Sequence, residues 1–343
     1  MLADVDVKTL LKRGALVAAA NWQVTVIQFM AESTFKMLLS VPVVGGILLV
    51  VLVLGRELPE LFSTDVRESI TFVATALVAE PLALISFLLA FGIVGLAGSA
   101  FMFLLKGGTV AVLAEAERHA AAVEAPPLRL EPFWTAARFS VRGYESGCTR
   151  FLRRFLRLGL ILILVYVVST AAYLVVLLRG SDWIADGQFG WTAIAGVGST
   201  VLVVWITLVN FFYLLVQMVV VVEDCGVRSA ARRVIGFLRA EPSMAFGVFG
   251  VVLLLVVGAT VVSLIATTSL GLIAFVPLAG LAVVPLQLLA WLFRGLVFQY
   301  LGLSALSAYL TLYRRYSGSG AWPASAAGGG SPGAPPAGGA FQE

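Results

Sequence analysis

Long apolar stretches separated by short polar ones dominate the pattern of the chain. An α-helix rises about 1.5 Å per residue, so about 20 apolar residues cross a hydrocarbon core of about 30 Å. We predict six transmembrane helices, over residues 37–54, 82–105, 156–178, 193–222, 245–267 and 286–312. These stretches are apolar on all sides, whereas the strands of a membrane barrel alternate in polarity. The sequence therefore predicts an all-α integral membrane protein with six spans.

The composition supports a membrane protein. Of 343 residues, 60% are hydrophobic and 12% are charged, and the mean hydropathy is +1.00. A soluble domain is about 45–50% apolar and about 25% charged. So few charges cannot cover a water-facing surface, which excludes a soluble enzyme, a disordered protein or a coiled coil as a description of the whole chain.

The basic residues predict the orientation, because Lys and Arg concentrate on the cytoplasmic side of membrane proteins. With the N-terminus inside, 18 of the 23 basic residues fall on the inner side. The other five lie outside or within the membrane: Lys36, Arg56, Arg67, Arg179 and Arg294. We therefore expect both termini in the cytoplasm.

One further apolar segment, Gly14–Ala31, is long enough to span but contains Asn21, Gln23 and Gln28. We interpret it as an interfacial helix with Trp22 at the depth of the headgroups, leading into the first span. The alternative is a seventh crossing, which would leave 16 basic residues inside instead of 18.

A basic amphipathic segment precedes the first, third and fifth spans, beginning at Val5, Glu131 and Glu223. This pattern predicts three units, each made of a surface helix followed by a hairpin of two spans. A helix with arginines beside its apolar face suits an anionic inner membrane surface. The candidate lipid-surface residues are Arg138, Arg142, Arg150, Arg153, Arg154, Arg228, Arg232 and Arg233.

The last residues, 317–343, are rich in Gly, Ala, Pro and Ser and have almost no charge. Such a segment cannot bury a core. We expect a helical membrane domain over residues 1–316 and a flexible cytoplasmic tail after it.

The run VVVVEDCGVRSAARRVIGFLR at Val219–Arg239 carries a family resemblance. Its Glu223, Asp224, Gly226, Val227 and Ala230 match a pattern of uncharacterised bacterial six-span membrane proteins, in which serine is common at the position of Arg233. The pattern is similar to the membrane domain attached to some glycerophosphodiester phosphodiesterases. The phosphodiesterase domain has no counterpart here, so the resemblance implies a fold type in the bacterial inner membrane and no reaction.

No motif indicates a catalytic, cofactor or metal site. Lys106-Gly107-Gly108-Thr109 lacks the rest of a phosphate-binding loop, and we interpret it as a break where the second span leaves the membrane. Gly92, Gly95 and Gly98 predict close helix packing. The two cysteines do not form a Cys-x-x-Cys motif, and one histidine is too few for a metal site. We expect no cofactor, no metal and no nucleic-acid partner.

Polar groups inside spans are candidate functional residues, and here they are Arg294, Glu80, Asn210 and Gln299. Arg294 precedes Arg314 by 20 residues, about 30 Å along a helix, which predicts a position near the outer interface. There it could snorkel beside Trp291, or pair with Glu80, the nearest acid in the predicted topology.

Two functions from different classes remain open. Three basic surface segments favour a non-enzymatic inner-membrane protein that organises anionic lipids or a partner protein. Arg294 and the Pro- and Gly-containing segments around Pro42 and over Leu270–Pro285 favour a transporter or channel for a small or lipid-like solute. A cavity lined by Asn210, Gln299 and Arg294 would favour transport, and a packed interior would favour the organising role.

Overall fold

A computed structural model describes residues 6–54, 75, 79–125, 130–183, 188–274 and 279–318. Throughout these ranges the regular structure is α-helical, with no strand. Six helices are long and apolar enough to cross a membrane, which confirms the all-α, six-span fold. The helices are α1 (Val7–Ala20), α2 (Trp22–Leu54), α5 (Pro81–His119), α6 (Leu130–Ala136), α7 (Val141–Trp183), α8 (Gln188–Val222), α9 (Val227–Ala240), α10 (Pro242–Ala274) and α11 (Ala279–Tyr316).

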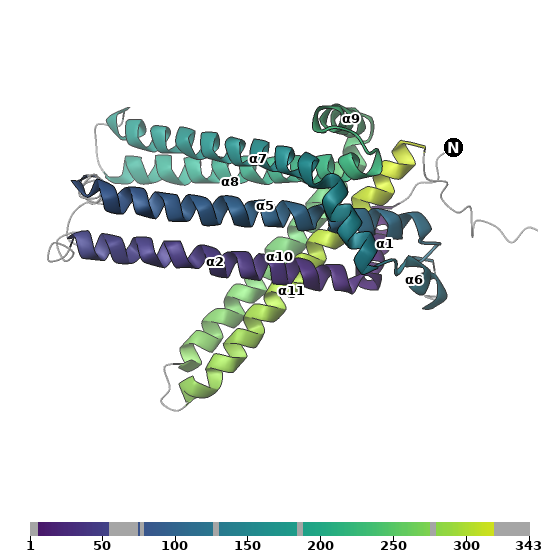
Figure 1. Ribbon diagram of the computed structural model, residues 1–343, viewed down its shortest axis with the longest axis horizontal. Helices are drawn as coiled ribbons and strands as arrows, with labels where there is room; N and C mark the ends of the chain where they lie inside the picture. The colour runs from purple at the N-terminus through teal and green to yellow at the C-terminus, as the bar shows by residue number, and fades with distance from the viewer. Residues whose placement is uncertain are drawn as a thin grey trace, which may run out of the picture.

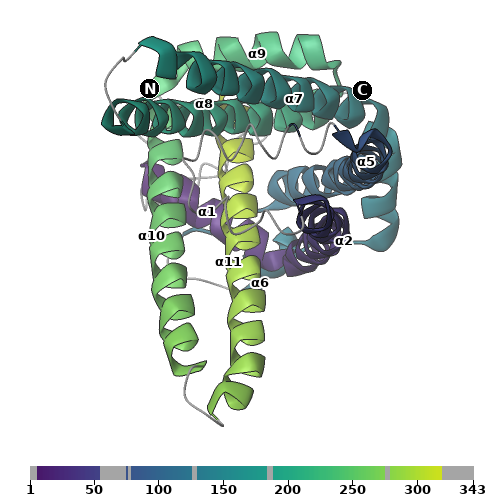
Figure 2. The same ribbon diagram turned by 90° about the vertical axis from the view of Figure 1, so that its left-hand side faces the viewer.

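The six long helices form three antiparallel pairs: α2 with α5, α7 with α8, and α10 with α11 (Figure 1). The pairs meet at one end of the molecule, where α1, α6 and α9 also lie. The α10–α11 pair leaves this end in a different direction from the other two pairs (Figure 2). The predicted hairpins are therefore present.

The buried residues gather at this common end, which we call the basal core. Its largest fully buried side chains include Leu10, Leu113, Phe155, Phe237 and Tyr309, which come from five different helices. Farther along the long helices the large apolar side chains are mostly exposed. Lipid is the solvent that tolerates such a surface, so the exposed parts are the membrane-spanning segments. The helices are longer than a bilayer requires because their basal ends pack against one another.

Four charged side chains lie inside the basal core, each 4–7% exposed: Arg13, Glu117, Glu124 and Arg314. Arg13 reaches Glu117 at 3.4 Å and Glu124 at 2.9 Å, and Arg314 reaches Glu117 at 2.6 Å. Arg13 also donates to the carbonyls of Ala120 and Ala121, just beyond the end of α5. The two arginines thereby connect α1 and α11 to the C-terminal end of α5 and neutralise its two acids.

The segment Gly14–Ala31 is divided between two helices and does not form a seventh crossing of its own. Its first part belongs to α1, which packs in the basal core against α11, and its second part begins α2 and the first span. Asn21 separates the two helices. Its amide donates to the carbonyls of Val17 and Ala136, and its side-chain oxygen accepts from the backbone N–H groups of Arg138 and Phe139. The polarity of Asn21 argued against a transmembrane span, and its hydrogen bonds instead fix the junction between α1 and α2.

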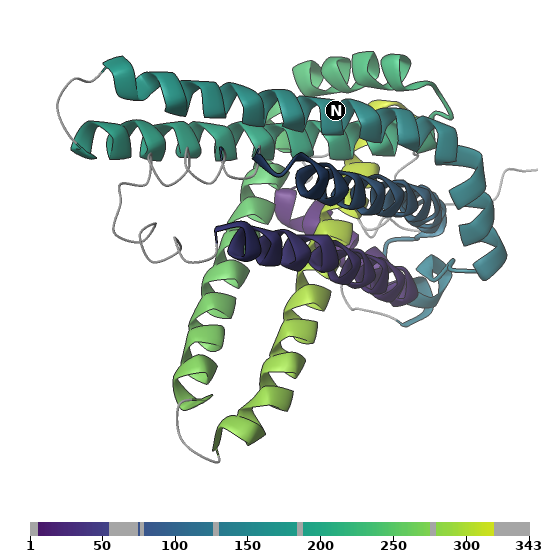
Figure 3. The ribbon, with the colours of Figure 1, turned by 60° about the vertical axis from the view of Figure 1, so that its left-hand side comes forward.

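The three predicted surface helices differ from one another. In the first unit, α1 is buried instead of lying on a surface. In the second, most of the amphipathic segment is continuous with α7, which bends before it runs beside α8 (Figure 3). Only α9 is a separate amphipathic helix on the outside of the bundle. The amphipathic pattern is common to the units because each apolar face packs on a neighbouring helix.

The predicted interruptions are absent from the described helices. Gly107 and Gly108 lie within continuous α5, where Gly108 packs against Tyr144 and Cys148 of α7. Pro42 lies inside α2, and Pro285 lies inside α11. Most of Leu270–Pro285 therefore belongs to α10 and α11. Of the predicted tail, Ser317 and Gly318 end the described chain, and residues 319–343 lie outside the described residues.

Candidate functional site

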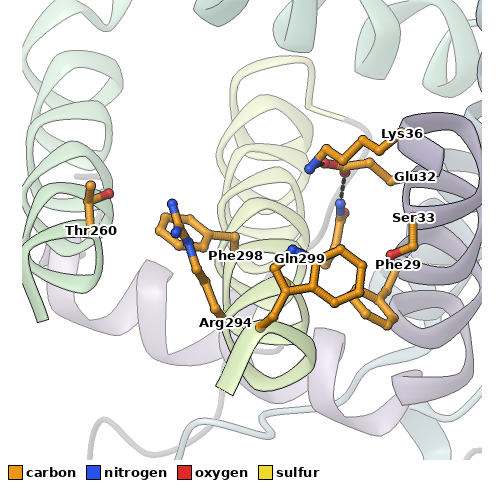
Figure 4. A pocket seen from close by; sticks show the side chains of 10 residues that line it. Phe29, Glu32, Ser33, Lys36, Thr260, Arg294, Phe298 and Gln299 are labelled. Atoms are coloured by element: carbon orange, nitrogen blue, oxygen red, sulfur yellow. Dashed lines mark hydrogen bonds and ion pairs between the residues drawn. The ribbon is translucent and has the colours of Figure 1, made fainter. Parts of the chain in front are cut away.

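A cavity of about 480 Å³ opens between α2, α10 and α11 (Figure 4). It combines aromatic and polar side chains from α2 and from the consecutive helices α10 and α11, which are far from α2 in the sequence. The lining residues are Phe29, Glu32, Ser33 and Lys36 from α2, Thr260 from α10, and Trp291, Arg294, Gly295, Phe298 and Gln299 from α11. We call this cavity the polar pocket.

The α2 side of the polar pocket contains an ion pair. Glu32 and Lys36 are one helical turn apart, and their charged atoms are 2.5 Å apart. The side-chain amide of Gln299 donates to the same carboxylate from α11. Figure 4 shows the three side chains meeting on one side of the pocket. The negative charge of Glu32 is therefore already neutralised by Lys36.

Arg294 is the charged residue of the polar pocket that has no partner of opposite charge among the described residues. Its guanidinium lies 5.7 Å from the centre of the Phe298 ring, a distance suitable for a cation–π interaction. No described acid forms an ion pair with it. A guanidinium stays protonated in proteins, so the polar pocket has a net positive charge. This charge favours an anionic ligand.

The predicted position of Arg294 near the outer interface is not supported, because Arg314 is a poor reference point. Arg314 lies inside the basal core and not at the membrane surface. The buried basal part of α11 begins at Leu303, nine residues after Arg294, or about 14 Å along the helix. Arg294 is thus nearer to the start of this buried part than to Ala279, the first residue of α11, which is 15 residues away. Glu32 and Lys36 lie where α2 passes from its basal part to its exposed part.

An apolar crevice adjoins the polar pocket. It has a volume of about 560 Å³ and lies between α10 and α11. Trp291, Arg294 and Phe298 line both spaces, and the crevice extends from them toward Gly271 and Gln287, near the tip of the hairpin. The charged space therefore lies beside an apolar space that runs along the span, and the two share a wall of three residues.

The structure brings Arg294 and Gln299 together but places the other two candidate residues elsewhere. Asn210 accepts a hydrogen bond from the Tyr166 hydroxyl at 2.6 Å, between α8 and α7. Glu80 is exposed before the first turn of α5 and forms no ion pair with Arg294. The acid of the polar pocket is Glu32 instead.

The candidate lipid-surface arginines are at the basal end and divide into two groups. Arg150 and Arg154 of α7 bind Asp224, and Arg233 of α9 binds Glu223. The hydrogen bonds from Arg150 and Arg154 lower the pKa of Asp224 below its ordinary value. The other candidates are exposed and form no ion pair with a described residue: Arg138, Arg142, Arg153, Arg228 and Arg232.

Sequence reasoning missed Glu32 and Lys36 as site residues because they fall between the segment Gly14–Ala31 and the first predicted span, which begins at residue 37. An acid and a base four residues apart, directly before an apolar run, were the available signal. In the described part of the chain, His, Cys, Asp and Glu form no group of three that could hold a metal. Comparison with protein-family models, characterised proteins and solved structures finds no match.

Proposed function

We propose that the protein is a non-enzymatic membrane protein that binds an anionic amphiphile, such as a phospholipid, between α2, α10 and α11. One observation carries the proposal: the positively charged polar pocket shares three lining residues with the apolar crevice. An amphiphile needs these two environments side by side. Its headgroup would lie beside Arg294 and its acyl chain along the crevice.

The depth of the site supports a ligand taken from the inner leaflet. Lys36 and Glu32 lie at the basal end of the first span, on the side where the basic residues concentrate. The crevice leads away from that side toward the hairpin tip. A lipid with its headgroup at the basal side would extend its acyl chains in the same direction as the crevice. Binding such lipids is consistent with a lipid-organising role in the bacterial inner membrane.

The chemistry of the polar pocket suits binding better than catalysis. Its polar side chains are two cations, an amide, two hydroxyls and one carboxylate that is paired with Lys36. Hydrolysis would need a free base or an activated nucleophile.

Transport of the same class of ligand is the second candidate. The pocket joins two hairpins, α2–α5 and α10–α11, that point in different directions. A change of their angle would alter the access to Arg294. Reconstituted protein that moves a fluorescent anionic lipid between leaflets would support transport, whereas binding without movement would support the organising role.

The binding proposal can be tested by lipid photocrosslinking. The protein would contain p-benzoylphenylalanine in place of Val262, which lines the crevice, in nanodiscs of phosphatidylglycerol and phosphatidylcholine. We expect more adduct with phosphatidylglycerol than its mole fraction predicts. Arg294→Met should lower this preference about fivefold, the factor implied by about 1 kcal/mol per basic side chain.

Two controls make the result specific. Arg294→Lys should keep much of the preference, because it keeps the charge. Arg179→Met removes an exposed arginine of α7 that lines neither space and should change nothing. Equal adduct with both lipids in the unmodified pocket, or an equal effect of Arg179→Met, would contradict the proposal.

A further inference from the structure

A second elongated space, independent of the polar pocket, lies where α9 crosses the α7–α8 hairpin. This groove has a volume of about 500 Å³. It is lined by α7, α8 and the first two turns of α9, almost entirely with aliphatic and aromatic side chains such as Ile161, Val165, Val209 and Phe212. Arg228 of α9 is the one charged residue in the lining.

The groove runs along the α7–α8 hairpin, from the edge of the basal core into the membrane-spanning part. Its α8 residues extend from Val216, at the edge of the basal core, to Trp205, about 16 Å farther along the span by helix rise. In Figure 1, α9 is seen nearly end-on where α7 and α8 lie lengthwise, so it crosses them at the basal end of the groove. The charged rim is therefore at the basal side, and the apolar part extends into the exposed, membrane-spanning part of the hairpin.

The charges around the rim are positive. Arg228 is exposed and forms no ion pair with a described residue. Arg154 and Arg157 of α7 precede the lining residues Leu158 and Ile161 by one helical turn, so they lie on the same face. The two nearby acids are already paired, Asp224 with Arg150 and Arg154, and Glu223 with Arg233. The surplus charge is available to a phosphate.

We propose that this groove is a binding site for an anionic phospholipid of the inner leaflet, with one acyl chain between α7 and α8 and its phosphate at Arg228. The positive charge of Arg228 favours an anionic headgroup, and the apolar lining of the groove favours an acyl chain. A bound lipid would fill the space beneath α9 and hold this helix against the hairpin.

The test uses a crosslinker inside the groove. The full chain, with p-benzoylphenylalanine in place of Val209, is placed in nanodiscs of phosphatidylglycerol and phosphatidylcholine and irradiated. We expect the ratio of phosphatidylglycerol to phosphatidylcholine adducts to exceed the ratio of the lipids supplied. Arg228→Gln should lower this preference about fivefold, as expected for one basic side chain near the headgroups.

Arg232→Gln is the matched control, because Arg232 is also exposed on α9 but does not line the groove. It should leave most of the preference intact. The phosphatidylcholine adduct reports in every variant that the hairpin is folded, and a crosslinker in place of Val165 provides a second position on α7. Adducts without lipid preference at both positions, or equal losses in Arg228→Gln and Arg232→Gln, would overturn the proposal.

The two lipid sites are distinguishable. Arg294→Met should not change the adducts formed at residue 209, and Arg228→Gln should not change those formed at residue 262. Loss of preference at one position alone would refute one site and leave the other standing.

Discussion

At the scale of single residues, the charges that sequence reasoning counted as inner-surface cations divide into buried and exposed ones. Arg13 and Arg314 are 3% and 6% exposed, and each binds an acid and a backbone carbonyl near the end of α5. Burying an unpaired charge costs several kcal/mol. These residues therefore form a structural network, whereas Arg228 and Arg294 keep their charge available to a ligand.

The buried network gives a stability prediction. Glu117→Ala leaves Arg314 without its carboxylate and weakens the environment of Arg13, so the free energy of unfolding should fall by about 3–5 kcal/mol. Glu115→Ala is the control on the same helix, since Glu115 is exposed and pairs only with Arg118 and His119. It should cost less than about 1 kcal/mol. Thermal unfolding in detergent would compare them, and equal effects would contradict the network's role.

Asn21 gives a second prediction at this scale. Its side chain makes four hydrogen bonds that connect the end of α1 to the segment before α7. In Asn21→Ala the backbone N–H groups of Arg138 and Phe139 lose their acceptor. We expect a loss of at least about 2 kcal/mol, because an unsatisfied buried donor costs about 1–3 kcal/mol. A variant as stable as the parent would show that water replaces the amide.

At the scale of helices, close packing depends on which glycines face a neighbour. A Cβ atom at Gly108 would lie 2.6 Å from the Cys148 sulfur and 2.7 Å from the Tyr144 carbonyl oxygen. A Cβ at Gly98 would meet the ring of Phe35, whereas Gly92 and Gly95 have no such neighbour within 4 Å. Of the three glycines predicted to pack, only Gly98 therefore contacts another helix closely.

This difference predicts opposite outcomes for two substitutions on α5. Gly108→Ala should force α5 away from α7 and destabilise the protein by about 1–3 kcal/mol, the usual cost of overpacking. Gly95→Ala should be neutral or slightly stabilising, since alanine is the better helix former. Thermal stability of the two purified variants provides the measurement. A neutral Gly108→Ala would show that the two helices are not in close contact there.

Hydropathy located the spanning helices because lipid requires an apolar surface all round. It could not separate the membrane from the basal core, since the two surroundings select the same side chains. Val216–Val220 and Leu303–Leu312 were assigned to spans, yet nearly all of these residues are buried among other helices. The break predicted at Lys106–Thr109 is wrong, because α5 continues through these residues and packs there against α7.

The sequence indicated two residues of the polar pocket, Arg294 and Gln299, but not their neighbour Glu32. Arg294 and Gln299 were conspicuous because they interrupt an apolar run. Their neighbour Glu32 lies 267 residues from Gln299 in the sequence, so no spacing rule could have joined them. Glu80 was proposed as a partner because it is the nearest acid in the predicted topology, but the α10–α11 hairpin diverges from α5 (Figure 2), and no described acid forms an ion pair with Arg294.

At the scale of the whole molecule, the basal core and the three hairpins share one orientation. The basal end contains most of the arginines, so we predict that it faces the cytoplasm. In a Cys148→Ala, Cys225→Ala background, Glu80→Cys should react with an impermeant maleimide added to intact cells. Arg239→Cys, at the exposed end of α9, should be protected until the membrane is opened. The reverse labelling would invert the topology.

The central claim is that the polar pocket and the crevice together bind an anionic amphiphile. A structure determined in nanodiscs of phosphatidylglycerol and phosphatidylcholine tests it most directly. The account predicts a phosphate within hydrogen-bonding distance of Arg294 and an acyl chain between α10 and α11, in contact with Trp291 and Phe298. The claim would be contradicted by a pocket filled with protein side chains, with Arg294 bound to an acid of this chain.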